Sequence, residues 1–201
     1  MARRRRTHAP RAGEAPRILG GALKGRTLEV PKGRATRPLR ALARRSLFDI
    51  LGPAVRDARV LDLYAGAGTV GFEAVSRGAA EVVLVERAPA AIRALEKSVE
   101  RLGVADRVVV EVRDVRRFLA SGPAPFDVVF LGPPYPLWTG PGRAELEEVA
   151  DELEPVLAED GVLVLESPGL ADLAVPGLIA ADARSYGDTR LNFMRRPSPA
   201  G

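Results

Sequence analysis

The sequence predicts an α/β fold in which a mostly parallel β-sheet carries helices on both faces and an antiparallel hairpin at one edge. From residue 59 onward, short and almost wholly apolar runs alternate with segments whose apolar residues recur at helical spacing. Strands of this kind are typical of a parallel sheet that is covered on both faces. Near the C-terminus, two strand-like segments flank Gly187 and Asp188, which indicates a hairpin.

The elements are expected in the following order. A small hairpin over residues 17–30 pairs residues 18–19 with 27–30, and a helix over residues 39–51 is closed by Gly52 and Pro53. Strands are then expected over residues 60–64, 81–86, 107–112, 126–131 and 161–166. Helices are expected between them over residues 69–77, 89–102, 115–120 and 143–157. The final hairpin pairs residues 178–186 with 189–194.

With 201 residues, 46% of them hydrophobic, the chain is long enough for one domain with a substantial core. Residues 1–16 hold Arg, Pro, Ala and Gly without apolar periodicity, so we expect a disordered basic tail. We expect a hairpin and helix extension over residues 17–56, the main α/β domain over 57–196 and a short disordered tail over 197–201.

Basic charge is concentrated in the first third of the chain. Residues 1–60 hold 16 Lys and Arg against 4 Asp and Glu, a net charge of +12, whereas residues 61–201 hold 14 against 22, a net charge of −8. This asymmetry is typical of a polyanion-binding arm joined to a catalytic body, because neutralised phosphates release counterions. A solvated tail that adds solubility is the alternative interpretation, and the run Arg3–Arg6 fits either one.

Composition excludes several kinds of chemistry. The chain has no cysteine, which excludes disulfides and thiolate chemistry, and its one histidine, His8, leaves no cluster for a metal or a serine triad. No apolar run approaches the roughly 20 residues of a membrane span, and no apolar segment follows the N-terminal charges as in a signal peptide. We expect a soluble, cytoplasmic protein without a metal or a membrane partner.

A glycine-rich turn follows the first strand of the alternating region. Gly66, Gly68 and Gly71 satisfy the pattern G-x-G-x-x-G, and Glu86 ends the next strand, 20 residues after Gly66. The glycines let a ligand approach the backbone, and the acid can accept hydrogen bonds from ribose hydroxyls. The pattern fits a dinucleotide, another nucleoside-type cofactor, or a tight turn without a ligand.

Two further acidic residues bear on the identity of the cofactor. Asp62 lies four residues before the first glycine, where its charge would repel a pyrophosphate but would suit a cofactor with a positive centre. S-adenosyl-L-methionine has a sulfonium and an ammonium group and no phosphate. Asp114, after the third strand, is expected to accept a hydrogen bond from an adenine amine, to cap the helix that follows, or to do both.

A rigid corner follows the fourth strand, at the sheet edge where ligands bind in such folds. Gly132, Pro133, Pro134 and Tyr135 form it, and the two prolines remove N–H donors while leaving carbonyls that can accept from an amine. Tyr135 offers a ring on which a flipped-out base can stack. A proline-stiffened loop with a core aromatic is the alternative, and Trp138 fits either a second stacking surface or a packed lid.

On these motifs the chain resembles the RsmD-type bacterial 16S rRNA (guanine-N2)-methyltransferases, a family of class I, S-adenosylmethionine-dependent methyltransferases. The similarity runs from Arg17 to about Met194 and rests on the segments Arg17–Gly21, Lys24–Leu28, Arg37–Pro38, Leu47–Leu51, Asp62–Gly68, Gly132–Tyr135 and Tyr186–Thr189. The resemblance implies a Rossmann-like fold with a seven-stranded sheet. It also implies methyl transfer from S-adenosyl-L-methionine to the exocyclic N2 amine of a guanine, in 16S rRNA of the small ribosomal subunit or an assembly intermediate, by a monomer.

The resemblance also implies roles for particular residues. The cofactor is expected to contact Asp62, Tyr64, Gly66, Gly68, Glu86, Arg87, Asp114 and Val115. The target guanine is expected to be held and methylated at Gly132, Pro133, Pro134 and Tyr135. The RNA is expected to contact Arg17, Lys24, Arg26, Arg34, Arg37 and Trp138.

Two departures from the family pattern leave an alternative open. The family usually has Asp where this chain has Gly132, and the segment Leu39–Arg45 lacks the Thr and Glu that the family typically shows. A catalytically weakened or inactive RNA-binding or assembly factor on a methyltransferase fold is therefore the second hypothesis. A nicotinamide-dependent oxidoreductase is the third, and Asp62 and the lack of a second catalytic motif disfavour it.

Overall fold

The structure is a computed structural model that describes residues 15–31, 39–169 and 171–197. The predicted N-terminal tail falls almost wholly outside these residues, and so does most of the predicted C-terminal tail. The two predicted RNA contacts Arg34 and Arg37 also lie outside the described residues.

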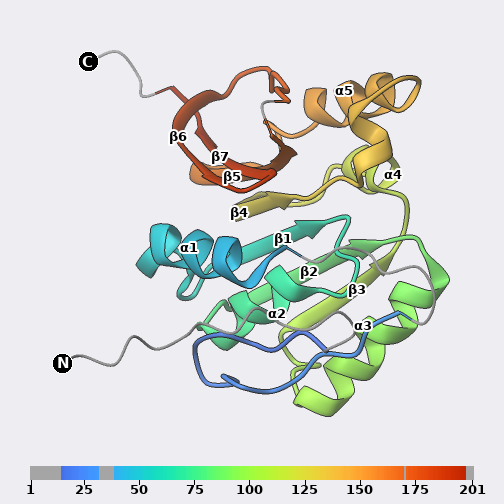
Figure 1. Cartoon of the computed structure of the whole chain (residues 1–201), viewed down its shortest axis with the longest axis vertical. Helices are drawn as coiled ribbons and strands as arrows, with labels where there is room; N and C mark the ends of the chain where they lie inside the picture. The colour runs from blue at the N-terminus through green and yellow to red at the C-terminus, as the bar shows by residue number, and fades with distance from the viewer. Residues whose placement is uncertain (1–14, 32–38, 170, 198–201) are drawn as a thin grey trace.

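One seven-stranded sheet forms the centre of the molecule, in the order β3-β2-β1-β4-β5-β7-β6 (Figure 1). Its strands are β1 (Arg59–Leu63), β2 (Glu81–Glu86), β3 (Val108–Val112), β4 (Phe126–Leu131), β5 (Leu157–Pro168), β6 (Ile179–Tyr186) and β7 (Thr189–Arg195). The first five strands are parallel, and β7 pairs antiparallel with both β5 and β6. The predicted mostly parallel sheet with an antiparallel C-terminal edge is confirmed.

Helices cover both faces of this sheet because alternate strand residues are apolar on each side. The helices are α1 (Ala41–Leu51), α2 (Thr69–Ser76), α3 (Pro89–Leu102), α4 (Val115–Leu119) and α5 (Gly142–Asp151), with short 3-10 helices η1 (Gly52–Val55) and η2 (Tyr135–Trp138). One core contains buried side chains of α1, α2 and α3, and the other contains those of α4, η2 and α5. The predicted three-layer arrangement is confirmed.

Three predicted elements differ clearly from the structure. The strand expected over residues 161–166 is longer, since β5 begins at Leu157 and ends at Pro168. The helix predicted to reach residue 157 ends at Asp151, because Pro155 cannot continue a helix and disfavours helical backbone in the residue before it. The N-terminal hairpin is reduced to one antiparallel bridge between Arg17 and Thr27. Across it, the N–H groups of Ile18 and Leu28 donate to the carbonyls of Arg26 and Pro16. The N–H groups of Leu19 and Glu29 donate instead to Glu73 of α2 and Ser98 of α3.

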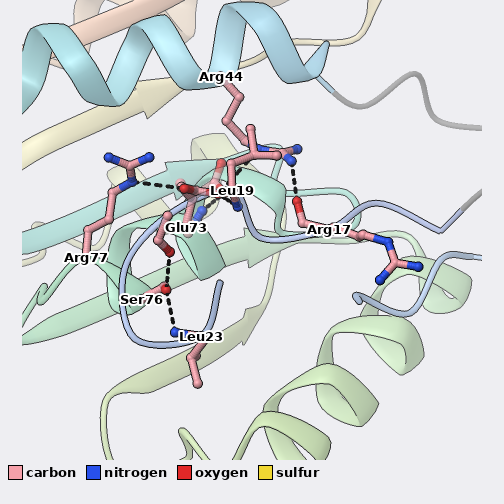
Figure 2. A network of polar contacts seen from close by, with 10 residues as sticks. Arg17, Leu19, Leu23, Arg44, Glu73, Ser76 and Arg77 are labelled. Atoms are coloured by element: carbon pink, nitrogen blue, oxygen red, sulfur yellow. Dashed lines mark hydrogen bonds and ion pairs between the residues drawn. The ribbon is translucent and has the colours of Figure 1, made fainter. Parts of the chain in front are cut away.

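The N-terminal segment is fixed to α2 by buried polar groups (Figure 2). Glu73, which is 0% exposed, accepts from the N–H of Leu19 at 2.7 Å and from Nε of Arg77 at 2.9 Å. Nε of the buried Arg44 lies 3.7 Å from the same carboxylate, and its Nη2 donates to the carbonyl of Arg17 at 2.6 Å. Segments from three parts of the chain therefore meet at one buried carboxylate.

Ser76 of α2 extends this attachment by one turn. Its hydroxyl donates to the carbonyl of Gly20 at 2.6 Å and accepts from the N–H of Leu23 at 2.9 Å. Ile18 and Leu28 are buried in the same core as α1, α2 and the sheet. The N-terminal segment thus shares one core with the main α/β domain. The predicted boundary between them near residue 57 stays a prediction.

Candidate functional site

A cavity of about 360 Å³ lies at the carboxyl ends of β1, β2, β4 and β5. The structure brings together there most of the residues predicted for cofactor and base: Asp62, Tyr64, Gly66, Glu86, Arg87, Val115, Gly132, Pro133, Pro134, Tyr135 and Trp138. The glycine-rich turn and the Pro-Pro-Tyr corner therefore line one hollow, although they are far apart in the sequence. Parallel strands place their carboxyl ends at a common edge, which explains this meeting.

Glu86 closes the glycine-rich turn from the neighbouring strand. Its Oε2 accepts a hydrogen bond from the N–H of Gly66 at 2.8 Å, and its Oε1 accepts from the N–H groups of Arg87 and Ala88, each at 2.8 Å. These three donors fix the carboxylate at the rim of the cavity. Because a carboxylate has about four acceptor positions, Glu86 keeps about one for a hydroxyl group of a ligand.

Asp62 lies on the cavity floor at the end of β1. It is 2% exposed, and its Oδ2 accepts from the N–H of Gly71 at 3.0 Å. Burial raises the pKa of Asp62 to about 8, and the nearby charges of Glu86 and Glu166 act in the same direction, while the Gly71 hydrogen bond opposes them. A cation bound in the cavity would favour the ionised form of this carboxyl group.

Gly71 and Tyr64 shape the turn in different ways. A Cβ on Gly71 would lie 2.2 Å from Cδ2 of Leu84, so glycine allows α2 to pack directly on β2. Tyr64 has a φ of 61°, a left-handed conformation that is strained for a bulky residue. Its buried hydroxyl has no hydrogen-bond partner among the described residues, and burial raises the pKa of that hydroxyl.

Two predicted cofactor residues do not line the cavity. Gly68 has a φ of 68° and is the N-cap of α2. Asp114 is the N-cap of α4, which was one of its two predicted roles. Its Oδ1 accepts a hydrogen bond from the N–H of Arg116 at 3.1 Å. Its Oδ2 lies 2.7 Å from Nη1 of Arg87, which lines the cavity. A hydrogen bond from Asp114 to an adenine amine stays a prediction.

The Pro-Pro-Tyr corner turns directly into η2. The carbonyl of Pro134 accepts a hydrogen bond from the N–H of Leu137 at 2.9 Å. It is one of the carbonyls predicted to accept from the substrate amine, and it already has a partner within the corner. Tyr135 is 47% exposed and lines the cavity, which leaves its ring accessible to a base. Trp138 is only 6% exposed, packs in the core beside α5 and lines the cavity, which favours the packed lid over a second stacking surface. Its contact with RNA stays a prediction.

Glu166, at the end of β5, is a cavity residue that sequence analysis missed. It lines the cavity beside Gly132, and none of the described residues donates a hydrogen bond to its carboxylate or pairs with it as an ion. Burial raises the pKa of Glu166 to about 7. The signal for it was an acid that ends an apolar strand at the same sheet edge as Asp62 and Glu86.

The remaining predicted RNA contacts lie on the N-terminal segment. Arg17, Lys24 and Arg26 are exposed, and Nη2 of Arg26 donates to the carbonyl of Arg101 at 2.9 Å. Within the altered segment, Leu39 is buried and lines the cavity, and Arg44 is bound to Glu73. These two residues thus have packing and ion-pair roles in the structure.

The part of the chain that the structure describes contains no group of three or more His, Cys, Asp or Glu side chains placed to hold a metal ion. Within the same residues, no helix has the length and apolar character required to cross a membrane.

Comparisons with known proteins agree with this geometry. The sequence profile of the family described as "Conserved hypothetical protein 95" matches residues 16–195. The ribosomal RNA small subunit methyltransferase D of Escherichia coli is 37% identical over 153 residues, which are 75% of this chain and 74% of that protein. The solved structure of yhhF from Escherichia coli has a TM-score of 0.80 at 32% identity and covers 92% of this chain and 100% of its own.

A more distant structure carries a ligand. SMU.776, complexed with SAH, has a TM-score of 0.58 at 11% identity, and the match covers 73% of this chain and 48% of that one. At this identity the likeness shows a common fold alone.

Proposed function

The chain belongs to the RsmD family, described as "Conserved hypothetical protein 95", and from this premise we propose that it is an S-adenosylmethionine-dependent methyltransferase of small-subunit ribosomal RNA. We further propose that the methyl acceptor is the exocyclic N2 amine of a guanine. One observation carries the proposal: a glycine-rich turn closed by Glu86 and a Pro-Pro-Tyr corner line the same cavity.

The cavity chemistry fits S-adenosylmethionine better than a phosphate-bearing cofactor. Asp62, Glu86 and Glu166 all line it, and in their ionised forms these carboxylates would repel a pyrophosphate. The sulfonium and ammonium groups of S-adenosylmethionine would be attracted instead. The fixed carboxylate of Glu86 is placed to accept from ribose hydroxyls, while Asp62 lies deeper, under the turn.

Catalysis in this proposal rests on orientation. When bound, S-adenosylmethionine supplies an electrophilic methyl group on a sulfonium. The protein's part is to hold the base so that its amine faces that methyl group in line, which replaces an encounter in solution by a fixed geometry. Tyr135 supplies the stacking surface, and the two prolines before it restrict the backbone that carries this side chain.

The exposed basic residues Arg17, Lys24 and Arg26 are proposed to contact RNA phosphates. Each phosphate contact releases counterions, so it strengthens binding and makes it sensitive to salt. Replacing Lys24 by Gln is expected to weaken RNA binding and to reduce the slope of log affinity against log salt by about one. An unchanged slope would remove Lys24 from the proposed RNA surface.

The proposed activity is tested by incubating the protein with methyl-labelled S-adenosylmethionine and separated ribosomal subunits from a strain that lacks an enzyme of this family. Label in the RNA of the small subunit, and not in that of the large subunit, is the expected result. If the cofactor binds and neither RNA is labelled, the second hypothesis, an RNA-binding or assembly factor on this fold, replaces the first.

A further inference from the structure

Gly132 presents no side chain at the start of the corner that is proposed to hold the substrate amine. Such an amine is conjugated with its ring and weakly nucleophilic, so a hydrogen-bond acceptor on its N–H would assist attack and take up the proton that is lost. Of the corner's carbonyls, that of Pro134 is already bonded to Leu137. The other carbonyls of the corner can accept a hydrogen bond from the amine but are too weakly basic to take up its proton, so a carboxylate from another element would complete the site.

Glu166 lies where such an acceptor is required. The parallel register pairs Leu131 of β4 with Leu165 of β5, so the next residues of the two strands, Gly132 and Glu166, are neighbours. A Cβ built on Gly132 would lie 3.5 Å from Oε2 of Glu166. The carboxylate thus reaches the space into which a side chain at position 132 would extend.

Strand pairing fixes the backbone of Glu166, and a neighbouring ring limits the size of the side chain at position 132. On its other side, Glu166 pairs with Leu191 of β7, so its backbone is fixed within the sheet. A Cβ on Gly132 would also lie 2.8 Å from Cε1 of Phe130, which is closer than real Cβ atoms approach. A larger residue at position 132 would have to displace that ring.

We propose that Glu166 accepts a hydrogen bond from the substrate's exocyclic amine and receives its proton during methyl transfer, from β5 and in place of any side chain at position 132. This inference rests on the proposed function. The amine lone pair forms the new N–CH3 bond, the S–CH3 bonding pair stays on sulfur as a thioether, and one amine proton moves to the carboxylate. The step then balances without another reactant.

The free carboxylate of Glu166 agrees with this role. No described residue competes for it, and its pKa, raised by burial to about 7, places its ionisation near neutrality. Other charged groups face the same cavity, namely Asp62 of β1, Glu86 of β2, and Arg87 and Arg113 from the loops after β2 and β3. Any pH profile must therefore be compared with that of a variant that lacks only Glu166.

The test measures single-turnover methylation of small subunits and S-adenosylmethionine affinity for wild type, Glu166→Gln, Glu166→Asp and the control Glu159→Gln. Glu159 is an exposed residue of the same strand. We expect Glu166→Gln to lower the rate at saturating cofactor about 100-fold and to abolish the rise of rate with pH near pH 7, with cofactor affinity unchanged. Glu166→Asp should keep that pH dependence at a reduced rate, and Glu159→Gln should behave as wild type.

Three results would overturn the proposal. A Glu166→Gln variant as fast as wild type would show that no acceptor is needed there. A loss confined to S-adenosylmethionine affinity would assign Glu166 to the cofactor. A Gly132→Asp variant several-fold faster than wild type would show that the acceptor is missing in this chain. A wild type that binds cofactor but methylates no RNA would instead refute the proposed function.

Discussion

The N–H of Gly66 donates a 2.8 Å hydrogen bond to Oε2 of Glu86, which joins the glycine-rich turn after β1 to the end of β2. The other oxygen of the carboxylate is held by the N–H groups of Arg87 and Ala88. The carboxylate is therefore oriented before any ligand arrives. Preorganisation of this kind reduces the free-energy cost of ordering the site when a ligand binds.

Replacing Glu86 by Gln is expected to weaken S-adenosylmethionine binding by about 10-fold or more, because a bond to a charged acceptor contributes roughly 1.5–3 kcal/mol. Calorimetric titration measures the effect. Glu81→Gln is the matched control at the other end of β2, where the side chain pairs with Arg59 at the surface. Equal affinity of both variants would show that Glu86 does not contact the cofactor.

From the raised pKa of Asp62 we predict that cofactor binding depends on pH. Its pKa of about 8 in the free protein means that the carboxyl group is mainly protonated at neutral pH. A bound cation favours the ionised form, so affinity should rise as pH increases toward about 8 and level off above it, with release of up to about one proton at neutral pH.

Calorimetry in buffers of different ionisation enthalpy counts the protons released by Asp62. Asp62→Asn keeps an acceptor for the N–H of Gly71 but cannot ionise. This variant should lose most of the proton release and the rise in affinity. The same pH dependence in wild type and in Asp62→Asn would contradict the assignment.

Glu73→Ala tests the attachment of the N-terminal segment shown in Figure 2. Removing this carboxylate leaves the buried Arg44 without its charge partner, and breaking a buried ion pair costs about 3–5 kcal/mol of unfolding free energy. Urea denaturation measures the loss of unfolding free energy. Hydrogen exchange at the amides of Leu19 and Leu23 should accelerate.

Glu81→Ala is the control for the Glu73 prediction. It removes a half-exposed ion pair with Arg59, with side chains 39% and 36% exposed, and should cost less than about 1 kcal/mol. Equal losses in the two variants would mean that Glu73 does not anchor the segment.

Tyr135→Ala is expected to lower kcat/KM for methyl transfer by about 10- to 100-fold, since stacking of a base on an aromatic ring contributes roughly 1–3 kcal/mol. Its effect on S-adenosylmethionine affinity should be small. Tyr135→Phe keeps the ring and should retain nearly full activity. If the Ala variant turns over normally, the base does not stack on this side chain.

The sequence was sufficient for features that depend on local spacing. Gly66 and Glu86 could be placed together because the fingerprint fixes the distance between a glycine turn and the end of the next strand. The mostly apolar strands and the segment around Gly187 predicted the parallel sheet and its antiparallel edge correctly. Pro155 is incompatible with a helix that continues to residue 157, although α5 ends earlier, at Asp151.

Features that depend on pairing between distant segments could not be predicted. The N-terminal hairpin was wrong in detail because Glu73 and Ser76 accept from the N–H groups of Leu19 and Leu23, and the positions of these acceptors are known only once α2 has packed. Glu166 was missed because its place beside Gly132 depends on the register of β4 and β5. The acid at the end of an apolar strand indicated the sheet edge, but an almost wholly apolar strand gives no alternation that would show which residue of its neighbour lies beside it.

The most direct test of the central claim is nucleoside mass spectrometry on small-subunit RNA that lacks the modification, after incubation with this protein and S-adenosylmethionine. We predict N2-methylguanosine as the one new methylated nucleoside, and much less of it after an equally short incubation with Tyr135→Ala. A methyl group on another atom of guanine, or on another base, would contradict the assignment of an exocyclic guanine amine as acceptor.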